Sequence, residues 1–341
     1  MIENANPSVI DLPVTDPRWQ SFVSRSPLTL FQSPLWGSII EQTYGFPARA
    51  TAFVENGSVV GGLPYASVDD FRGRRRICYA FADVCEPIGL CTLPLLQEAL
   101  LHGDISWRIR SRDDLAGLAQ QNPNCVHHTL QLSTSVAEAQ ARCHPKQRAN
   151  VKQAEKAGVT YRKLDDAEGL DIFFTLHSEL RKTKHRLLPQ PKKFFETIAE
   201  LYFPQAGFIL VAEHQAHPIA AMFFLIQGDG LYYKFSASDM NSLAVRPNHF
   251  LLWKGVEEGI NLGLRFLDLG ISEDEGLSRF KERLGAQHHH VYTFQSPVSQ
   301  KSAATLQIEQ ALGRLTEALT DSDVPLRTTQ AAGEVLYRFF V

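Results

Sequence analysis

The residues with the strongest potential for chemistry gather near position 270 of the chain. An apolar strand, Phe266–Leu269, contains Asp268 and ends at a glycine, and a short helix over 277–284 then presents Phe280 and Lys281. A lysine in such a place can stabilise negative charge that develops on a carbonyl oxygen, hold a phosphate, or simply be an exposed helix residue. Asp268 either orients an amine or is a buried carboxylate with backbone donors. Phe280 either walls a site or belongs to the core.

Two basic regions are candidate contacts for anions. Four arginines surround Gly73 in a predicted loop: Arg72, Arg74, Arg75 and Arg76. Arginine matches phosphate bidentately, but we favour a hairpin tip that charge keeps soluble. The stretch 142–163 is the most basic of the chain, and it is either a solvated helix face or a contact for a polyanion such as tRNA.

Several familiar catalytic motifs are absent from the sequence. It contains no Gly-x-Gly-x-x-Gly after a strand, no Gly-Lys-Ser/Thr phosphate loop and no Gly-x-Ser-x-Gly elbow. The run His288-His289-His290 puts two imidazoles on one face of a strand, but a metal needs further ligands. We therefore expect no metal site.

Composition bounds the class of protein. The chain has 341 residues, 34 lysines and arginines, 37 aspartates and glutamates, and a formal net charge of −3. This balance argues against a DNA-binding protein, and the length suggests two domains. We find no apolar run long enough to span a bilayer and no signal-peptide pattern. A peripheral membrane contact stays open. Five unpatterned cysteines indicate reduced thiols, so we expect a cytoplasmic protein.

The elements that would position these residues occur twice. The hairpin turn at Glu55-Asn56-Gly57 resembles the turn at Glu213-His214-Gln215, at an offset of 213 − 55 = 158 residues. A helix followed by a strand at Trp107 recurs as a helix followed by a strand at Phe266, at an offset of 266 − 107 = 159. Two features at nearly one offset favour a duplicated domain. We expect an α/β protein with two mixed sheets side by side and a ligand cleft between the domains.

Several segments together resemble the FemABX family, whose members pair two acetyltransferase-like (GNAT) domains, and its branch associated with cellulose and exopolysaccharide synthesis. They are Phe31–Trp36, Lys146–Val159, Leu231–Ser238, Arg246–Trp253, Leu267–Ser272, Gly276–Gly285 and Gly333–Arg338. The resemblance covers most of the chain. It implies tandem GNAT-like domains, which we place at 1–134 and 135–297, with a helical tail at 298–341.

The resemblance also implies transfer of an acyl or aminoacyl group to an amine. Well-understood relatives take an amino acid from aminoacyl-tRNA and place it on a peptidoglycan precursor. In this family the lysine of the Phe-Lys motif is tied to catalysis, which points to Lys281 beside Phe280. Arg186 looks like the anion-gripping arginine, and Tyr233 like the strand tyrosine that faces the acceptor.

Two departures from the family pattern bear on the donor. GNAT acetyltransferases cradle the coenzyme A pyrophosphate with Gln/Arg-x-x-Gly-x-Gly/Ala, whereas this chain has Arg246-Pro247-Asn248-His249-Phe250-Leu251. Arg246 is kept as a donor-site candidate, but both glycines are missing, and we expect the side chains of Phe250 and Leu251 to crowd the phosphates. Trp36 also lacks the nearby lysine that often grips a nucleotide-linked acceptor.

These observations lead to one main hypothesis and two alternatives. We expect an acyltransferase that forms an amide on an amine of a cell-envelope precursor, with aminoacyl-tRNA as donor and no tightly bound cofactor. The first alternative is an acyl-CoA-dependent N-acetyltransferase in exopolysaccharide biosynthesis. The second is a non-catalytic adaptor that binds a polysaccharide or a partner. The catalytic residue would be Lys281, with Phe280, Arg186, Tyr233, Asp268 and Arg246 as substrate contacts.

Overall fold

The computed structural model describes residues 7–101, 105–296 and 301–341. The chain forms two compact units. The first comprises residues 1–127, 289–309 and 341, and the second comprises 128–288 and 310–340. The domain ranges expected from the sequence, 1–134, 135–297 and 298–341, stay predictions, as does the cleft between domains.

The first unit is built on a mixed sheet. Its strands follow the order β1 (Ser8–Pro13), β2 (Ala48–Glu55), β3 (Ser58–Asp70), β4 (Gly73–Ile77), β6 (Ser106–Ser111) and β13 (Gln287–Gln295), with β5 (Ile88–Gly89) against β3. The helices are α1 (Pro17–Val23), η1 (Leu30–Gln32), α2 (Pro34–Tyr44) and α3 (Leu93–Leu101). All neighbouring pairs are antiparallel except β4 with β6, which α3 connects as a parallel crossover.

Helix α2 begins where the sequence indicates. The Ser33 hydroxyl accepts a hydrogen bond from the Leu35 amide at 3.2 Å, and Pro34 fills the first helical position. The helix ends at Gly45, whose φ of 69° lies in the left-handed region that glycine adopts without strain. The sequence signals for both ends of α2 agree with the structure because helix capping depends only on neighbouring residues.

Replacing Ser33 by alanine is expected to lower the free energy of unfolding by about 1 kcal/mol, because one amide of the first turn loses its acceptor. Urea denaturation followed by circular dichroism measures the change. Ser38, inside the same helix, donates to the Pro34 carbonyl at 3.1 Å. Its replacement by alanine serves as the control and should be nearly neutral. Equal effects of the two replacements would contradict the capping role.

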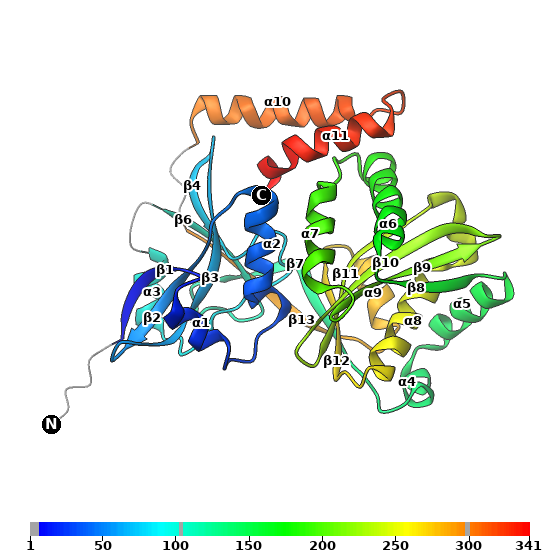
Figure 1. Cartoon of the computed structure of the whole chain (residues 1–341), viewed down its shortest axis with the longest axis horizontal. Helices are drawn as coiled ribbons and strands as arrows, with labels where there is room; N and C mark the ends of the chain where they lie inside the picture. Colours follow the sequence, from blue (N-terminus) through cyan, green and yellow to red (C-terminus); the bar gives the residue numbers. More distant parts are fainter. Residues whose placement is uncertain (1–6, 102–104, 297–300) are drawn as a thin grey trace. The chain divides into compact units, whose positions relative to one another are not determined.

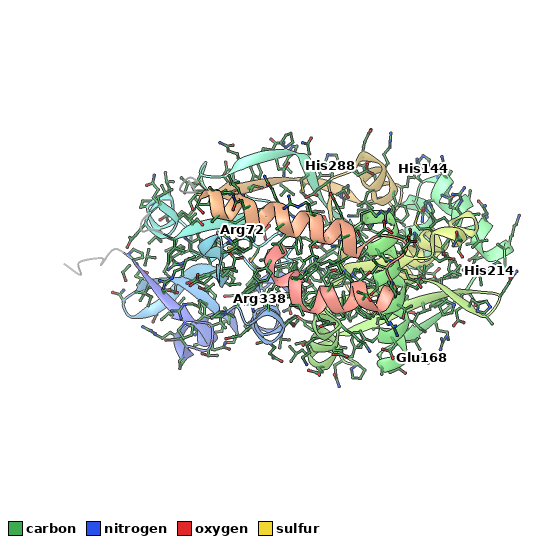
Figure 2. All side chains as sticks on the ribbon, turned by 90° about the horizontal axis from the view of Figure 1, so that it is seen from above. Arg72, His144, Glu168, His214, His288 and Arg338 are labelled. Atoms are coloured by element: carbon green, nitrogen blue, oxygen red, sulfur yellow. The ribbon has the colours of Figure 1, made fainter. Side chains whose placement is uncertain are left out.

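The arginines around Gly73 form a hairpin tip, as favoured above. Asp70 and Gly73 pair across the turn, and Arg75 contacts both oxygens of the Asp70 carboxylate at 2.7 and 3.0 Å. Arg72, which is labelled in Figure 2, donates to Glu309 at 2.8 Å. Because carboxylates already neutralise these guanidinium groups, the tip needs no phosphate ligand.

The second unit also contains a mixed sheet, with helices on both faces (Figure 1). The strand order is β8 (Thr160–Leu164), β9 (Gly207–His214), β10 (His217–Gln227), β11 (Gly230–Ser238) and β12 (Phe266–Ser272). The helices are α4 (Val136–Arg142), α5 (Pro145–Lys156), α6 (Ala167–Leu180), the π-helical turn η2 (Arg181–His185), α7 (Lys192–Tyr202), η3 (Met240–Val245), α8 (Pro247–Asn261) and α9 (Glu275–Glu282).

Alternation along β10 explains why both faces of this sheet are covered. Phe223 packs among aromatic rings of α6 and α7, including Phe173 and Phe195. The next residue, Phe224, faces the opposite core, which contains Phe250 of α8. Successive side chains of a strand point to opposite faces, so a continuous apolar strand buries both.

The two units repeat one arrangement of elements. In the first, the antiparallel strands β2, β3 and β4 lead through α3 to the parallel strand β6; in the second, β9, β10 and β11 lead through α8 to the parallel strand β12. Both first hairpins turn through two left-handed residues, Asn56-Gly57 and Gln215-Ala216. The repeat expected from the sequence offsets is therefore present in the fold.

The tail forms α10 (Ala303–Leu319), α11 (Leu326–Leu336) and the short turn η4 (Tyr337–Phe340). Its residues 310–340 pack in the second unit, where the Arg181 guanidinium donates to the Tyr337 hydroxyl at 3.4 Å. Across the described ranges of the chain, none of the helices combines the length and the apolar character that crossing a membrane requires.

Candidate functional site

A pocket of about 440 Å³ opens within the second unit, at the carboxyl end of β11. The parallel pairing of β11 with β12 covers only Gly230–Tyr232 and Phe266–Asp268, so the later residues of the two strands are not paired with each other. Helix α8 crosses from one strand to the other and begins at the pocket. In open α/β sheets such carboxyl ends are where ligands bind.

A β-bulge aims three side chains of β11 into this pocket. Phe223 pairs with Phe235 and Phe224 with Tyr233, which leaves Lys234 as an extra residue. One extra residue shifts the alternation of side chains by one. Tyr233, Ser236 and Ser238 therefore line one pocket although their spacing is three and two residues. Burial raises the pKa of the Tyr233 hydroxyl, which stays protonated at neutral pH.

The first turn of α8 forms a second wall. Arg246 precedes the helix in a left-handed conformation with a φ of 60°, and Pro247, Asn248 and His249 follow along the pocket. The unpaired amides and the dipole of a helix N-terminus favour an anion at such a place.

The expectation that Phe250 and Leu251 crowd this approach is wrong. Both side chains are buried in the core, at 3% and 0% exposure, because the helical turn directs them toward the sheet. The side chain that does lie at the pocket is that of His249.

The pocket is electropositive. Lys184 and His185 reach it from η2, and Arg246 reaches it from the start of α8. Burial, reinforced by Lys184 and Arg181, lowers the pKa of His185. None of the described residues that line the pocket is an aspartate or glutamate. The lining therefore suits an anionic group, with Leu277 and Phe280 of α9 providing an apolar side.

His249 is held firmly in this wall. Its Nδ1 lies 2.5 Å from Oε1 of Gln147, and its Nε2 lies 3.2 Å from Nδ2 of Asn150, both on α5. The Phe280 ring meets it edge-on with centroids 4.8 Å apart. Burial, together with the positive charges of Arg246, Arg283 and Lys146, lowers the pKa of His249 to about 4. The imidazole is therefore neutral at pH 7.

Lys281 is not among the described residues that line the pocket. Its side chain is 2% exposed, and its ammonium donates to the carbonyls of Gly270 and Ile271 at 3.3 and 2.7 Å. The lysine thus ties α9 to the end of β12. This contact orients Phe280, the neighbouring residue, which does line the pocket.

Two further sequence candidates also lie outside the pocket lining. The Asp268 carboxylate is buried and accepts a hydrogen bond from the Gly270 amide at 2.8 Å, which is the structural role considered above. Arg186 is exposed, and its guanidinium donates to the Thr320 carbonyl at 2.6 Å. Of the six candidates, the structure brings together Phe280, Tyr233 and Arg246.

Sequence reasoning missed several lining residues. Lys184 and His185 belong to the basic run that ends at Arg186, but which of its members faces a ligand depends on the π-helical turn. Asn248 and His249 lie inside the segment compared with the phosphate loop. Ser236 and Ser238 needed knowledge of the bulge at Lys234, for which the sequence holds no clear signal.

A second polar cluster surrounds the buried His128. The His128 Nε2 lies 3.1 Å from the Ser278 hydroxyl, and Glu282 lies 3.1 Å from both that hydroxyl and the Nδ1 of His288. In the parts of the chain that the structure describes, no three His, Cys, Asp or Glu side chains are placed to hold a metal ion. The cluster fastens α9 to its neighbouring strands.

Comparison with protein families identifies part of this unit. Residues 143–282 match the model described as "Acetyltransferase (GNAT) domain". The match contains β11, α8 and α9, whose residues line the pocket. A search of curated protein sequences finds no match to the chain.

Solved structures share the fold of the whole chain. A structure of FemX has a TM-score of 0.63 at 14% identity, covering 89% of this chain and 99% of its own. A tandem GNAT protein from the clavulanic acid biosynthesis pathway has a TM-score of 0.54 at 11% identity, covering 86% and 100%. L-PGS from Bacillus licheniformis has a TM-score of 0.52 at 13% identity, covering 90% and 98%.

These findings define the class of protein. Residues 143–282 match a GNAT acetyltransferase domain, which supports an acyltransferase, and the chain shares its fold with FemX and with a tandem GNAT protein. The expected α/β class and tandem GNAT-like architecture are confirmed.

Proposed function

We propose that this protein transfers an aminoacyl group from aminoacyl-tRNA to an amine of a cell-envelope precursor and so forms an amide. The observation that carries the proposal is the electropositive pocket where the N-terminus of α8 meets the end of β11, beyond the pairing of β11 with β12. The reaction consumes charged tRNA, which places it in the cytoplasm.

The negative charge of the donor's phosphates complements the positive charge of this pocket. Arg246 and Lys184 line the pocket, and within the same unit α5 exposes Lys146, Lys152 and Lys156 to solvent. A polyanion can contact such a helix while its 3′ end enters the pocket. Arg246 and Lys184 then take the anion-gripping role that the sequence resemblance gave to Arg186.

A neighbouring cavity suits the acceptor. Its volume is about 450 Å³, and it shares Leu180 and Ser238 with the donor pocket. Its lining includes the carboxylates of Glu179 and Asp239 and one ammonium, that of Lys182, which donates to the Val324 carbonyl. Hydrogen bonds from Ser242 and Asn241 lower the pKa of Asp239. A protonated amine is attracted to ionised carboxylates, so the two cavities distinguish acceptor from donor by charge.

The chemistry follows from this placement. The protonated amine first releases a proton to solvent, and its neutral nitrogen then attacks the ester carbonyl carbon. The carbon–oxygen ester bond breaks, and the tRNA hydroxyl leaves with a second proton that the amine gives up. The carbonyl oxygen becomes negative in between, and hydrogen-bond donors of the pocket stabilise it. Lys281 contributes by fixing the end of β12 and the position of Phe280.

Arg246→Gln tests the donor site. We expect about a tenfold weaker binding of aminoacyl-tRNA, measured by filter binding at two salt concentrations, with a smaller salt dependence because one phosphate contact is lost. The control is Arg265→Gln, which removes an exposed arginine paired with Asp229 in the same unit. Equal effects of both replacements would mean that Arg246 acts only through the overall charge of the protein, and this would contradict the donor site.

A transfer assay with both donors separates this proposal from its alternatives. Amide formation from acetyl-CoA with no transfer from charged tRNA would favour an N-acetyltransferase of exopolysaccharide synthesis, which the match to a GNAT acetyltransferase model supports. Binding without transfer from either donor would favour an adaptor.

A further inference from the structure

The side chain of His249 lies at the start of α8, beside the donor pocket. His249 is the third residue of α8, and its side chain lines the pocket beside Asn248 and Arg246. Helices that hold a diphosphate bring their first amides into direct contact with it, and glycine at this place keeps the approach open. In this chain the third position of the helix has the imidazole of His249.

The ring is fixed in that position. Gln147 and Asn150 hold its two nitrogens, and the edge of Phe280 packs against it. Gln147 is itself anchored, because its amide donates to the His249 carbonyl at 3.1 Å and its side chain is fully buried. Swinging the ring aside would break these contacts together.

The ring also brings no charge that would attract a diphosphate. Burial and three nearby cations hold the imidazole neutral at pH 7. With Nδ1–H donating to Gln147 and Nε2 facing the Asn150 amide, both nitrogens are engaged within the protein. His249 thus acts on a ligand through its volume.

We propose that His249 is a specificity-determining residue that excludes diphosphate-linked donors, such as coenzyme A thioesters, from the donor pocket. The inference rests on the proposed donor site at the start of α8. It selects donors whose phosphates are separate phosphodiesters, as at the end of a nucleic acid strand.

The test is a gain of binding in His249→Gly. Isothermal titration calorimetry measures coenzyme A, pyrophosphate and pantetheine against the full chain. We expect coenzyme A and pyrophosphate to bind His249→Gly at least tenfold more tightly than wild type. Pantetheine, which lacks the diphosphate, should bind both proteins equally.

One control and two further variants complete the test. His217→Gly removes an exposed histidine of β10 in the same unit and should not gain binding. His249→Ala, which suits a helix better, replaces His249→Gly should the latter unfold. In Gln147→Ala the ring remains but loses one anchor, so an intermediate gain is expected.

Two results would overturn the inference. The first is coenzyme A binding to wild type within tenfold of its binding to His249→Gly. The second is an equal gain for pantetheine, which would indicate general widening of the pocket. Transfer from charged tRNA is measured separately, so a failed transfer assay refutes the proposed reaction and leaves the diphosphate result standing.

Discussion

Replacing Lys281 by methionine is expected to lower acyl-transfer turnover by at least about tenfold and the free energy of unfolding by about 1–3 kcal/mol. The side chain is 2% exposed, and its ammonium bonds the carbonyls of Gly270 and Ile271. Without it, two buried acceptors at the end of β12 lose their donor. Phe280 then loses its fixed position along the pocket. Steady-state turnover and urea denaturation give the two numbers.

The two readouts separate a positioning role from a purely structural one. Arg279→Met is the matched control, because Arg279 lies on the same helix with its side chain 57% exposed and forms an ion pair with Glu275 on the surface. It should change neither quantity appreciably. Lys281→Arg, which keeps a cation, should restore part of the turnover. Unchanged turnover in Lys281→Met would refute any role in the reaction.

Acidification is expected to destabilise the second unit through His177. Its imidazole is 6% exposed and hydrogen-bonds Gln190 at 2.8 Å among the rings of Phe173 and Phe195. Burial lowers the pKa of His177 from 6.5 to about 3. Below pH 6.5 the imidazole therefore binds a proton in the unfolded chain, whereas in the folded chain it stays neutral down to about pH 3. The contribution of His177 to the free energy of unfolding is fully present above pH 6.5. It falls by about 2 kcal/mol between pH 7 and pH 5.

His177→Gln isolates this contribution, because it keeps an amide donor for Gln190 and cannot titrate. Differential scanning calorimetry of wild type and variant at pH 7 and pH 5 gives the difference in their pH dependence. The variant should lose less stability than wild type over this interval. His217, exposed on the same unit, provides His217→Gln as a control with the pH dependence of wild type. Parallel curves for His177→Gln and wild type would contradict the buried neutral imidazole.

Elements with local signals were predictable from the sequence. The Asn56-Gly57 turn occurs as expected. The Ser33-Pro34 start of α2 and the helix Leu93–Leu101 also have local signals in the sequence, because caps, left-handed turns and helical periodicity depend on neighbouring residues. The double offset that indicated a repeat also reflects chain order alone. The sequence did not indicate strand β1 or helix α11. Short segments of mixed polarity have no clear periodicity, and they form a strand or helix only when they pack against the rest of the fold.

The residues of the candidate site also fall into those that the sequence indicated and those that only the tertiary structure revealed. The resemblance of several segments to the FemABX family pointed to the Phe-Lys helix, to Tyr233 and to Arg246, and it implied acyl transfer. Which side chains face the pocket was decided by tertiary structure: a bulge at Lys234 turns Ser236 and Ser238 toward it. The buried carbonyls of β12 draw Lys281 away from the lining. Chain order is written in the sequence, whereas the direction of a side chain depends on strand register and on which buried polar groups must be satisfied.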